Sequence, residues 1–356
     1  MRTLSPDNLS RRKDEIMLRG AFGLQWHITN KCDQRCRHCY IWRKQCLDGV
    51  KDEPDLTECR RIADDFCDFC RSIDCTPSMT ITGGDPMLHP QFWEIMEYLA
   101  FRKIPLVILG NPFHLSLEKL QRLKELGVER FQLSIDGMEK THDFFRKKGS
   151  FQATLKAIDL INQVGIKSMI MSTVSLVNYE EMPEVARLCV QNKVSNYAFA
   201  RYCPTHGDSE HMMTAQQYRQ FLADMWAVYT ELAEGPTNFS LKDHLFTAYL
   251  YEEGLFHLRK EKNIIFEGCN CAVRHTCLLP NGDVYACRRF ESPVGNIRSQ
   301  SFRDLFFSKK MEDYRQFDQM EGCKDCELLC YCRGCHAVSA GLTGSFFDKD
   351  PQCWRC

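Results

Sequence analysis

The sequence predicts an α/β fold in which a parallel sheet built from six βα units is followed by a smaller, cysteine-rich domain. Over the first two-thirds of the chain, short apolar runs rich in β-branched residues alternate with longer amphipathic stretches. This alternation indicates parallel strands joined by right-handed helical crossovers. Cysteine is absent between Thr76 and Leu188, whereas eleven of the 21 cysteines fall from Cys269 onward. That change in cysteine density marks the second domain.

The individual elements follow from these patterns. The predicted strands span residues 22–29, 78–82, 105–109, 130–135, 167–174 and 196–201. The predicted helices between them span residues 56–73, 91–101, 117–126, 150–164 and 179–191. Two further helical stretches, 214–234 and 243–253, are expected to bridge to the second domain. There, the turn Asn281-Gly282-Asp283 predicts a hairpin between residues 276–279 and 284–286.

Composition narrows the functional class. The 356 residues are 44% hydrophobic, which is enough for one large domain and an appended smaller one. A net charge of −1 favours neither a nucleic acid nor an acidic membrane surface as a partner. Because no apolar run has the length of a membrane span and the N-terminus lacks a signal-peptide core, we expect a cytoplasmic protein. In such a protein, many cysteines indicate metal or redox chemistry rather than disulfides.

Three of these cysteines directly follow the first predicted strand. Cys32, Cys36 and Cys39 have the spacing C-x-x-x-C-x-x-C. Three thiolates can hold three irons of a [4Fe–4S] cube, which leaves the fourth iron for a small molecule to chelate. A zinc knuckle, or a cluster completed by a fourth cysteine from elsewhere, is the alternative. Zinc sites favour paired C-x-x-C motifs, often with histidine, so the spacing argues against zinc.

The residues around this triplet resemble the signature of the radical S-adenosylmethionine (radical SAM) enzymes. His38 stands before the last cysteine, where the family usually has an aromatic residue. After the next strand, Gly83-Gly84-Asp85-Pro86 resembles the family's GGEP loop, with Asp85 in place of Glu. The resemblance implies that this loop contacts the amino group of SAM, and glycine lets a backbone approach a ligand closely. On its own, the segment would be an ordinary tight turn.

A third segment, residues 131–151, resembles the S-x-D-G, H-D and R pattern of SPASM-type radical SAM proteins. The matching residues are Ser134, Asp136, Gly137, His142, Asp143 and Arg146. The resemblance places Ser134, Asp136 and Arg146 in the SAM site, with Ser134 on the ribose and Arg146 paired with the carboxylate. An arginine fork suits a carboxylate. The alternative for Arg146 is a solvated surface charge.

The resemblance implies a partial (β/α)6 TIM-like barrel that stays open, with the cofactor at the C-terminal ends of the strands, and a C-terminal SPASM domain that carries auxiliary [4Fe–4S] clusters. We therefore divide the chain into an N-terminal extension (1–21), a radical SAM partial barrel (22–213), a helical bridge (214–260) and a SPASM auxiliary cluster domain (261–356). Because the first strand begins at about residue 22, we expect no separate leader-binding domain before it.

The C-terminal cysteines match most of the SPASM pattern. The resemblance assigns a distal cluster to Cys323, Cys326, Cys332 and Cys353. It assigns a proximal cluster to Cys269, Cys287 and Cys335, with Cys271 or Cys277 as a possible fourth ligand. Cys335 comes one residue early in the pattern, and Cys330 and Cys356 are surplus.

A zinc ribbon is the alternative for this domain. It would use Cys323, Cys326, Cys332 and Cys335, whose two pairs lie much closer together in the chain than in usual zinc sites. We expect the remaining cysteines to be buried thiols; these are Cys46, Cys59, Cys67, Cys70, Cys75, Cys189 and Cys203.

The resemblance implies an enzyme that reductively cleaves SAM to a 5′-deoxyadenosyl radical. Its cofactors would be SAM and about three [4Fe–4S] clusters, and its partner an electron donor such as flavodoxin or ferredoxin. Auxiliary clusters suit a two-electron oxidation, such as a crosslink, on a ribosomally made peptide or small protein. A non-catalytic iron–sulfur electron carrier is disfavoured, because a carrier needs no SAM site.

Arg288 bears on the choice of substrate. It stands where sulfatase-maturing enzymes have an Asp that serves as the base. A guanidinium is a poor base at neutral pH, so we expect Arg288 and Arg289 to face a carboxylate part of the substrate instead. The alternative is that both arginines only cover the cluster or pair with Glu291. Formylglycine formation on a sulfatase, or a small-molecule or tetrapyrrole oxidation, remain the alternative activities.

Overall fold

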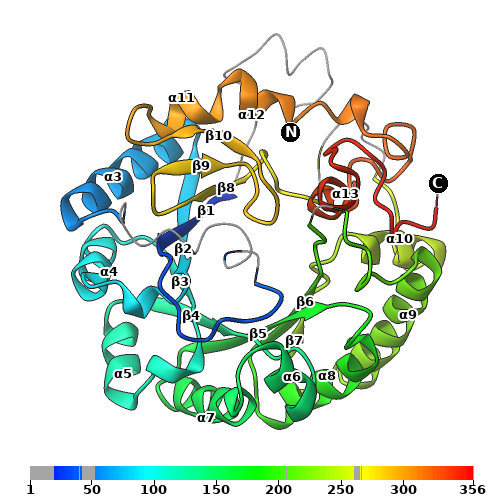
Figure 1. Cartoon of the computed structure of the whole chain (residues 1–356), viewed down its shortest axis with the longest axis horizontal. Coiled ribbons are helices and arrows are strands. Elements are labelled where there is room, and N and C mark those ends of the chain that lie inside the picture. Colours follow the sequence, from blue (N-terminus) through cyan, green and yellow to red (C-terminus); the bar gives the residue numbers. More distant parts are fainter. Residues whose placement is uncertain are drawn as a thin grey trace.

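The computed structural model describes residues 20–39, 41, 53–205, 207–259, 265 and 267–355. The strands form an inner ring and most of the helices form an outer ring around them (Figure 1). The predicted α/β fold is confirmed. The predicted N-terminal extension lies outside the described residues except for its last two positions.

All strands belong to one ten-stranded sheet in the order β10-β9-β8-β1-β2-β3-β4-β5-β6-β7. Their bounds are β1 Gly20–Thr29, β2 Cys75–Gly83, β3 Leu106–Leu109, β4 Val128–Leu133, β5 Lys167–Val174, β6 Asn196–Arg201, β7 Asn238–Phe239, β8 His275–Leu278, β9 Asp283–Tyr285 and β10 Pro293–Asn296. Strand β8 and strands β1 to β7 pair in parallel, whereas β9 and β10 are antiparallel.

The six predicted strands are confirmed, and β5 and β6 have the predicted bounds. The sheet extends beyond these six strands at both edges. At one edge, the two-residue strand β7 pairs with β6, and such a short segment carries no periodic pattern. At the other edge, β8 of the C-terminal hairpin pairs in parallel with β1. The two parts of the chain therefore share one sheet, although the sequence pattern separates them.

The helices of the barrel agree with their predicted ranges to within about three residues. Their bounds are α3 Leu56–Ser72, α4 Phe92–Phe101, α5 Leu117–Glu125, α7 Ser150–Gln163, α8 Met182–Gln191, α9 Ala215–Glu231 and α10 Leu245–Glu252. Shorter helices were not predicted; they are α6 Glu139–Phe145, α11 Phe302–Phe306, α12 Lys309–Asp313 and α13 His336–Thr343. The C-terminal hairpin is confirmed as β8 and β9.

Local sequence explains where several helices begin. Asp55 caps α3 by accepting a hydrogen bond from the Glu58 backbone N–H, and Thr214 with Gln217 forms a capping box at α9. Helix α8 has Pro183 in its first turn, where the missing N–H has no helical partner to lose. The preceding residues Tyr179–Glu181 form a 3₁₀ turn instead of extending α8.

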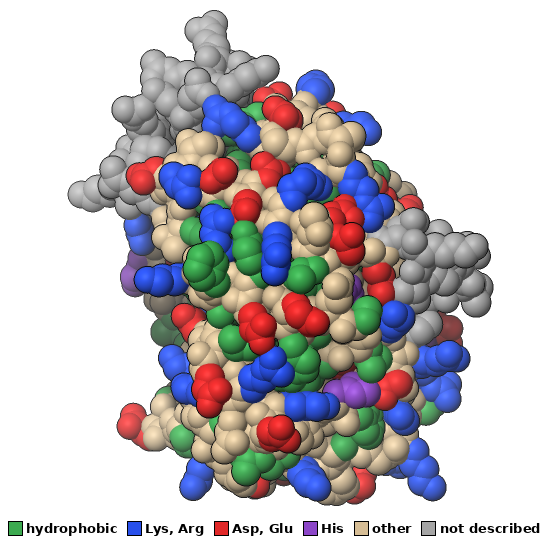
Figure 2. Space-filling view, turned by 90° about the vertical axis from the view of Figure 1, so that its left-hand side faces the viewer, with side chains coloured by type: hydrophobic (Ala, Val, Ile, Leu, Met, Phe, Trp, Pro, Cys, Tyr) green, Lys and Arg blue, Asp and Glu red, His purple; other side chains and the backbone are tan. Residues whose placement is uncertain are grey.

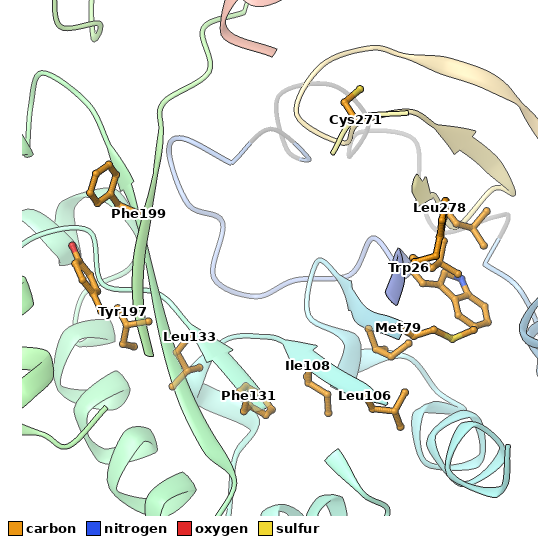
Figure 3. Packing of buried hydrophobic residues seen from close by; sticks show 14 of the residues in the cluster. Trp26, Met79, Leu106, Ile108, Phe131, Leu133, Tyr197, Phe199, Cys271 and Leu278 are labelled. Atoms are coloured by element: carbon orange, nitrogen blue, oxygen red, sulfur yellow. The ribbon is translucent and has the colours of Figure 1, made fainter. Parts of the chain in front are cut away.

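The apolar core lies between the strands and the outer helices. The buried apolar side chains of the strands pack there as one cluster; those labelled in Figure 3 include Trp26, Met79, Leu106, Ile108, Phe131, Leu133, Tyr197 and Phe199. Buried polar residues alternate with them along the same strands, for example Gln25 and His27 beside Trp26 on β1. Because side chains alternate between the two faces of a strand, these polar residues face the inside of the ring.

The C-terminal region packs closely against the end of β6. Arg201, at this end, is only 1% exposed and forms 2.8 Å ion pairs with Asp243 and with Asp350. Asp243 precedes α10, and Asp350 belongs to the C-terminal cysteine-rich region. This buried arginine therefore ties the barrel, the helical bridge and the C-terminal region together.

The surface over α3, α4 and α5 carries both signs of charge. Lys and Arg side chains are interspersed with Asp and Glu across the face shown in Figure 2, without a broad single-sign patch. Within the described part of the chain, no helix combines the length and apolarity that crossing a membrane requires.

Candidate active site and auxiliary cysteine sites

The Cys32, Cys36 and Cys39 triplet lies on the loop that follows β1, which crosses the inside of the ring (Figure 1). The loop is fixed at its start by the end of β2. Gly84 N–H donates a 2.9 Å hydrogen bond to Thr29 O, and Asp85 N–H donates a 2.7 Å hydrogen bond to Lys31 O. Burial raises the pKa of the Cys36 thiol, and the neighbouring thiols of Cys39 and Cys32 add to this rise, so the three thiols lie near one another.

Gly83 and Gly84 are required by this backbone contact. A Cβ on Gly83 would collide with the Thr29 carbonyl oxygen, and a Cβ on Gly84 would collide with the Lys31 carbonyl oxygen. Gly83 also has a φ of +146°, which other residues rarely adopt. The glycines predicted to approach a ligand therefore also hold the cysteine loop against β2.

Asp85 and Pro86, which the sequence places in the SAM site, are both buried. The Asp85 carboxylate accepts hydrogen bonds from the backbone N–H groups of Met87 at 2.9 Å and Asn111 at 2.8 Å. Pro86 begins the 3₁₀ turn that Asp85 caps. The Asp85 side chain thus supports the loop, and burial raises the pKa of this carboxyl.

Other anchors of the cysteine loop were not predicted from the sequence. Asn111 Nδ2 donates a 2.8 Å hydrogen bond to Asp33 Oδ1, and His114 Nε2 lies 3.2 Å from the same oxygen. On the other side, Gln34 Nε2 donates a 2.5 Å hydrogen bond to Ser150 Oγ at the start of α7. Asn111 and His114 are polar residues that closely follow β3, and this position is the sequence signal that could have identified them.

Asp136 and Arg146 form a buried ion pair beside the triplet. Arg146 Nε donates a 2.5 Å hydrogen bond to Asp136 Oδ2, and Arg146 Nη1 lies 3.6 Å from Cys36 Sγ. His38 Nε2 lies 3.4 Å from Asp136 Oδ2. Burial alone would raise the pKa of Asp136, but the charges of Arg146 and His38 lower it to about 2. Arg146 is therefore not a solvated surface charge. It is already paired with Asp136 in the protein, so a bound ligand would not be its only partner.

The remaining residues of this segment have different environments. Ser134 follows β4 and is half-buried. His142 is fully buried, accepts a hydrogen bond from Asp136 N–H at 3.2 Å and lies 3.1 Å from Ser150 Oγ. Burial lowers the pKa of His142 to about 4, so the ring is neutral at pH 7. Asp143 accepts hydrogen bonds from Gly149 and Phe151 N–H groups at the start of α7.

A cavity of about 310 Å³ adjoins the cysteine loop. Its walls come from this loop, the end of α6 and the residues after β5 and β6; they are Arg37, His38, Phe144, Phe145, Thr173, Ser175, Tyr202 and His211. The cavity lies at the C-terminal ends of the strands, where the family fold places its cofactor. Aromatic faces and polar groups suited to a nucleoside meet there beside the thiol triplet.

The four cysteines assigned to a distal cluster converge in the structure. Cys323, Cys326, Cys332 and Cys353 line one small cavity, and the guanidinium-bearing residues Arg333 and Arg355 also line it. Cys330 is not among the lining residues of this cavity, and Cys356 lies outside the described residues. Four thiols with adjacent cations suit an anionic thiolate-bound cluster.

The proximal cysteines form two neighbouring groups. Cys271 hydrogen-bonds the thiols of both Cys269 and Cys287, and His244 hydrogen-bonds Cys269. Cys335 is next to these thiols and lies 3.5 Å from Arg289 Nη1. Of the two alternatives for a fourth ligand, Cys271 is in direct contact with the group.

Cys277 and Cys203 have different surroundings from each other. Cys277 is fully buried on β8, where the charge of Arg288 acts on it. Cys203, expected to be a buried thiol, is half-buried and hydrogen-bonds Cys335. That expectation is wrong, because the segment after β6 meets the C-terminal region in space. The other expected buried thiols are confirmed, namely Cys59, Cys67, Cys70, Cys75 and Cys189, and Cys46 lies outside the described residues.

The donor sets fit iron–sulfur clusters. Within the described ranges, no three His, Cys, Asp or Glu side chains meet closely enough to hold a single metal ion. Cysteine thiolates are the usual ligands of iron–sulfur clusters, and each of these sites is built from at least three cysteines. Cys32, Cys36 and Cys39 would hold the cluster that binds SAM, and the two C-terminal groups would hold auxiliary clusters.

Positive charge gathers inside the ring near the proximal cysteines. The Lys242 side chain is exposed to solvent, and the charges of Arg288 and Arg289 act on it. Burial and the charges of Arg288 and Arg289 lower the pKa of Lys242 to about 8. Burial and the charge of Arg288 likewise lower the pKa of His27 to about 3 and that of His275 to about 4.

Arg288 also lines a narrow cavity between the barrel and the C-terminal hairpin. The lining comes from the end of β1, the segment after β6 and the residues after Cys287, and includes His27, Asn30, Thr205, Tyr285, Arg288, Arg289, Phe290 and Glu291. The cavity therefore connects the surroundings of the first cysteine loop with those of the proximal cysteines.

Comparison with known proteins identifies both parts of the chain. Residues 26–189 match the radical SAM superfamily, and residues 269–327 match SPASM, described as an iron–sulfur cluster-binding domain. These matches include the thiol triplet and the proximal cysteines Cys269, Cys271 and Cys287.

Similar proteins have more than one named activity. The chain is 25% identical over 349 residues to an AdoMet-dependent heme synthase of Nitratidesulfovibrio vulgaris, covering 93% of this chain and 91% of the relative. It is 27% identical over 349 residues to the mycofactocin maturase MftC of Mycolicibacterium smegmatis, covering 93% and 82%.

Among solved structures, the fold is similar to that of Streptococcus suis SuiB bound to S-adenosylmethionine, with a TM-score of 0.76, 19% identity and coverage of 98% of this chain and 80% of SuiB. SuiB has also been solved bound to its precursor peptide SuiA. The matched domains imply SAM and multiple [4Fe–4S] clusters as cofactors. The chain therefore contains a radical SAM domain that is followed by a C-terminal SPASM domain.

Proposed function

We propose that this radical SAM enzyme oxidises a ribosomally made peptide or small protein by two electrons. When bound at the thiol triplet, SAM supplies a 5′-deoxyadenosyl radical that takes a hydrogen atom from the substrate. The observation that carries the proposal is the cavity between the barrel and the hairpin, which runs from His27 and Asn30 to Arg288 and Arg289. A substrate that contacts the residues lining this narrow cavity would lie between the radical source and the proximal cysteines.

That position suits an oxidation. Removal of a hydrogen atom would leave an unpaired electron on the substrate, and the proximal cysteines would hold an auxiliary cluster suited to accept that electron. Arg289 contacts Cys335, and Arg288 follows Cys287 directly, so the cavity wall and the proximal site share one short segment. The peptide class is favoured by similarity to a mycofactocin maturase along most of the chain.

The residues of the chain would bind and orient the reactants. Asp136, held by Arg146 and by Thr173 N–H at 2.8 Å, fixes the inner wall of the SAM cavity. The buried aromatic rings of Phe145 and Tyr202 would exclude water from it. Arg288, Arg289 and Lys242 would bind carboxylates of the substrate, because positively charged side chains donate hydrogen bonds to carboxylates. None of the three serves as a base when charged.

The test is to incubate the anaerobically reconstituted protein with SAM, a one-electron reductant and a short peptide encoded beside its gene. Loss of two hydrogens from that peptide, detected by mass spectrometry, supports the proposal. Efficient formylglycine formation on a sulfatase-derived peptide would contradict the proposal and would support sulfatase maturation as the activity instead. Omission of SAM is the matched control.

A tetrapyrrole oxidation is the second candidate. It is favoured by the similarity to an AdoMet-dependent heme synthase over 93% of the chain and by the cationic lining, which suits propionate side chains. A SAM-dependent change in the visible spectrum of an added iron tetrapyrrole, without any modification of the peptide, would establish this alternative. The two substrates therefore give separate readouts.

We also propose that a one-electron donor, such as flavodoxin or ferredoxin, docks beside the cysteine loop. Arg37 follows Cys36 and lies over the Phe144 ring at 4.3 Å, and Lys147 lies over the Phe113 ring at 4.4 Å. Phe144 is 53% exposed. Exposed aromatic rings covered by cations suit an acidic protein partner, and this surface is near the cluster that must be reduced.

A further inference from the structure

Cys203 lies at the proximal cysteine site although it belongs to the barrel. It follows β6 two positions after Arg201, whereas the other thiols of the site come from the C-terminal domain. Cys203 hydrogen-bonds the Cys335 thiol and is near Cys287. The site therefore holds five thiols, whereas a [4Fe–4S] cluster has four irons to ligate. The five are Cys203, Cys269, Cys271, Cys287 and Cys335.

Close backbone packing builds this arrangement. Helix α13 approaches the segment after β6 so closely that a Cβ on Gly341 would collide with the Pro204 carbonyl oxygen. Gly207 N–H donates a 3.0 Å hydrogen bond to Gly341 O. Cys335 is the residue at the N-terminal boundary of α13. The meeting of Cys203 with Cys335 is thus set by the backbone and does not depend on flexible side chains.

The surroundings of the pair suit iron-bound thiolates. Arg289 Nη1 lies 3.5 Å from Cys335 Sγ, and the other terminal nitrogen of Arg289 donates to the Arg201 carbonyl oxygen. Cys203 and Cys287 both pack against a small buried cluster that contains Cys335. A guanidinium fixed beside sulfur favours the thiolate, which is the form that binds metal.

We propose that Cys203 is an alternate ligand of the proximal cluster and shares one iron with Cys335. Cys269, Cys271 and Cys287 would hold three irons, and the fourth would bind the thiolate of either Cys335 or Cys203. Exchange breaks one Fe–S bond and forms another. The proton of the incoming thiol passes to the outgoing thiolate, so the charge and the electron count of the site do not change.

The exchange has a structural consequence. With Cys335 bound, all four ligands belong to the C-terminal domain. With Cys203 bound, the cluster is linked directly to the segment after β6, at the C-terminal end of the barrel. The inference rests on the proposed ligands of the proximal cluster and is independent of which substrate the enzyme oxidises.

The test compares Cys203→Ala, Cys335→Ala and the double variant in the full-length, anaerobically reconstituted protein. Iron and sulfide content and the EPR spectrum of the reduced protein are the readouts. Each single variant should keep the wild-type content, and the double variant should lose about four irons or show a cluster with three. Cys189→Ala, which removes a buried thiol of α8, is the matched control.

Two results would overturn the inference. If Cys335→Ala alone loses as much iron as the double variant, Cys203 does not replace Cys335. If the double variant keeps all its iron and its EPR spectrum, neither thiol is a ligand. Wild-type protein with only about four irons would refute the proximal cluster itself, and this result would be visible before any variant is made.

A direct measurement covers the case in which the double variant does not fold. Selenocysteine enriched in the magnetic isotope of selenium can be placed at position 203 in the Cys335→Ala protein. A selenium hyperfine coupling in the EPR spectrum of the reduced auxiliary cluster is expected for an Fe–Se bond. Intact auxiliary cluster signals without that coupling would contradict the inference.

Discussion

Arg146 Nε donates a 2.5 Å hydrogen bond to Asp136 Oδ2 at a position where Asp136 is fully buried. The same guanidinium lies 3.6 Å from Cys36 Sγ. One side chain thus compensates a buried carboxylate and stands beside a thiol of the SAM-site triplet. A carboxylate of bound SAM would join a pair that already exists, so the loss of Arg146 should affect the fold before it affects binding.

The first prediction concerns this pair. Arg146→Ala should lower the free energy of unfolding by about 3–5 kcal/mol, because it leaves Asp136 buried without its partner. Asp136→Asn with Arg146→Ala should cost less than the sum of the two single changes. Chemical denaturation of the apo-protein measures these values. Additive effects would show that the two residues do not act together.

The second prediction concerns the glycine contact under the cysteine loop. Gly84→Ala should displace residues 29–31, because the new Cβ has no space beside the Lys31 carbonyl oxygen. We expect the loss of about four irons and of SAM cleavage. Gly23→Ala on β1 is the matched control, because the atoms nearest to its Cβ are at ordinary contact distances of 3.6 Å and more. Full iron content in the Gly84 variant would contradict the structural role.

Much of the fold could be predicted from the sequence because strands such as β6 contain a continuous apolar run with a polar residue at each end. Strand β7 has two residues and α6 has seven, so neither is long enough to show a period. The pairing of β8 with β1 joins residues far apart in the chain, and no local pattern reports such a contact.

The candidate site was predictable to a different degree in each part. The motif at Cys32 defines the triplet by spacing alone. The role of Arg146 could not be predicted, because its partner Asp136 is also part of the motif and the sequence does not say which contact each side chain makes. Cys203 was missed because its neighbour Cys335 approaches only through the packing of α13 on the segment after β6.

The third prediction concerns metal content. The reconstituted wild-type protein should contain about twelve irons per chain, as expected for three [4Fe–4S] clusters. Changing Cys323 and Cys326 together to Ala should remove about four irons and leave substrate-free SAM cleavage intact, since these residues line the distal cavity. One zinc ion per C-terminal domain, measured by elemental analysis, would contradict the cluster assignment.

The fourth prediction concerns the electron donor. Lys147→Glu should raise the KM for reduced flavodoxin several-fold, because like charges would then face an acidic partner. The rate with dithionite should not fall, since a small reductant needs no protein interface. Lys167→Glu, at the start of β5, is a charge-matched control. Equal loss with both reductants would place the defect in the SAM site and not in docking.

The last prediction concerns pH and follows from Lys242. Its pKa is lowered to about 8 by burial and by Arg288 and Arg289, so the ammonium group loses its proton as the pH rises through that value. Binding of a carboxylate-bearing probe, such as coproporphyrin III, should therefore weaken between about pH 7 and pH 9 by several-fold, while Arg288 and Arg289 stay charged. Fluorescence titration of the reconstituted protein measures this affinity. Lys242→Arg should remove the pH dependence because a guanidinium stays protonated, and Lys242→Met should show the weaker affinity at every pH. An unchanged pH profile in both variants would show that Lys242 does not contact the bound carboxylates.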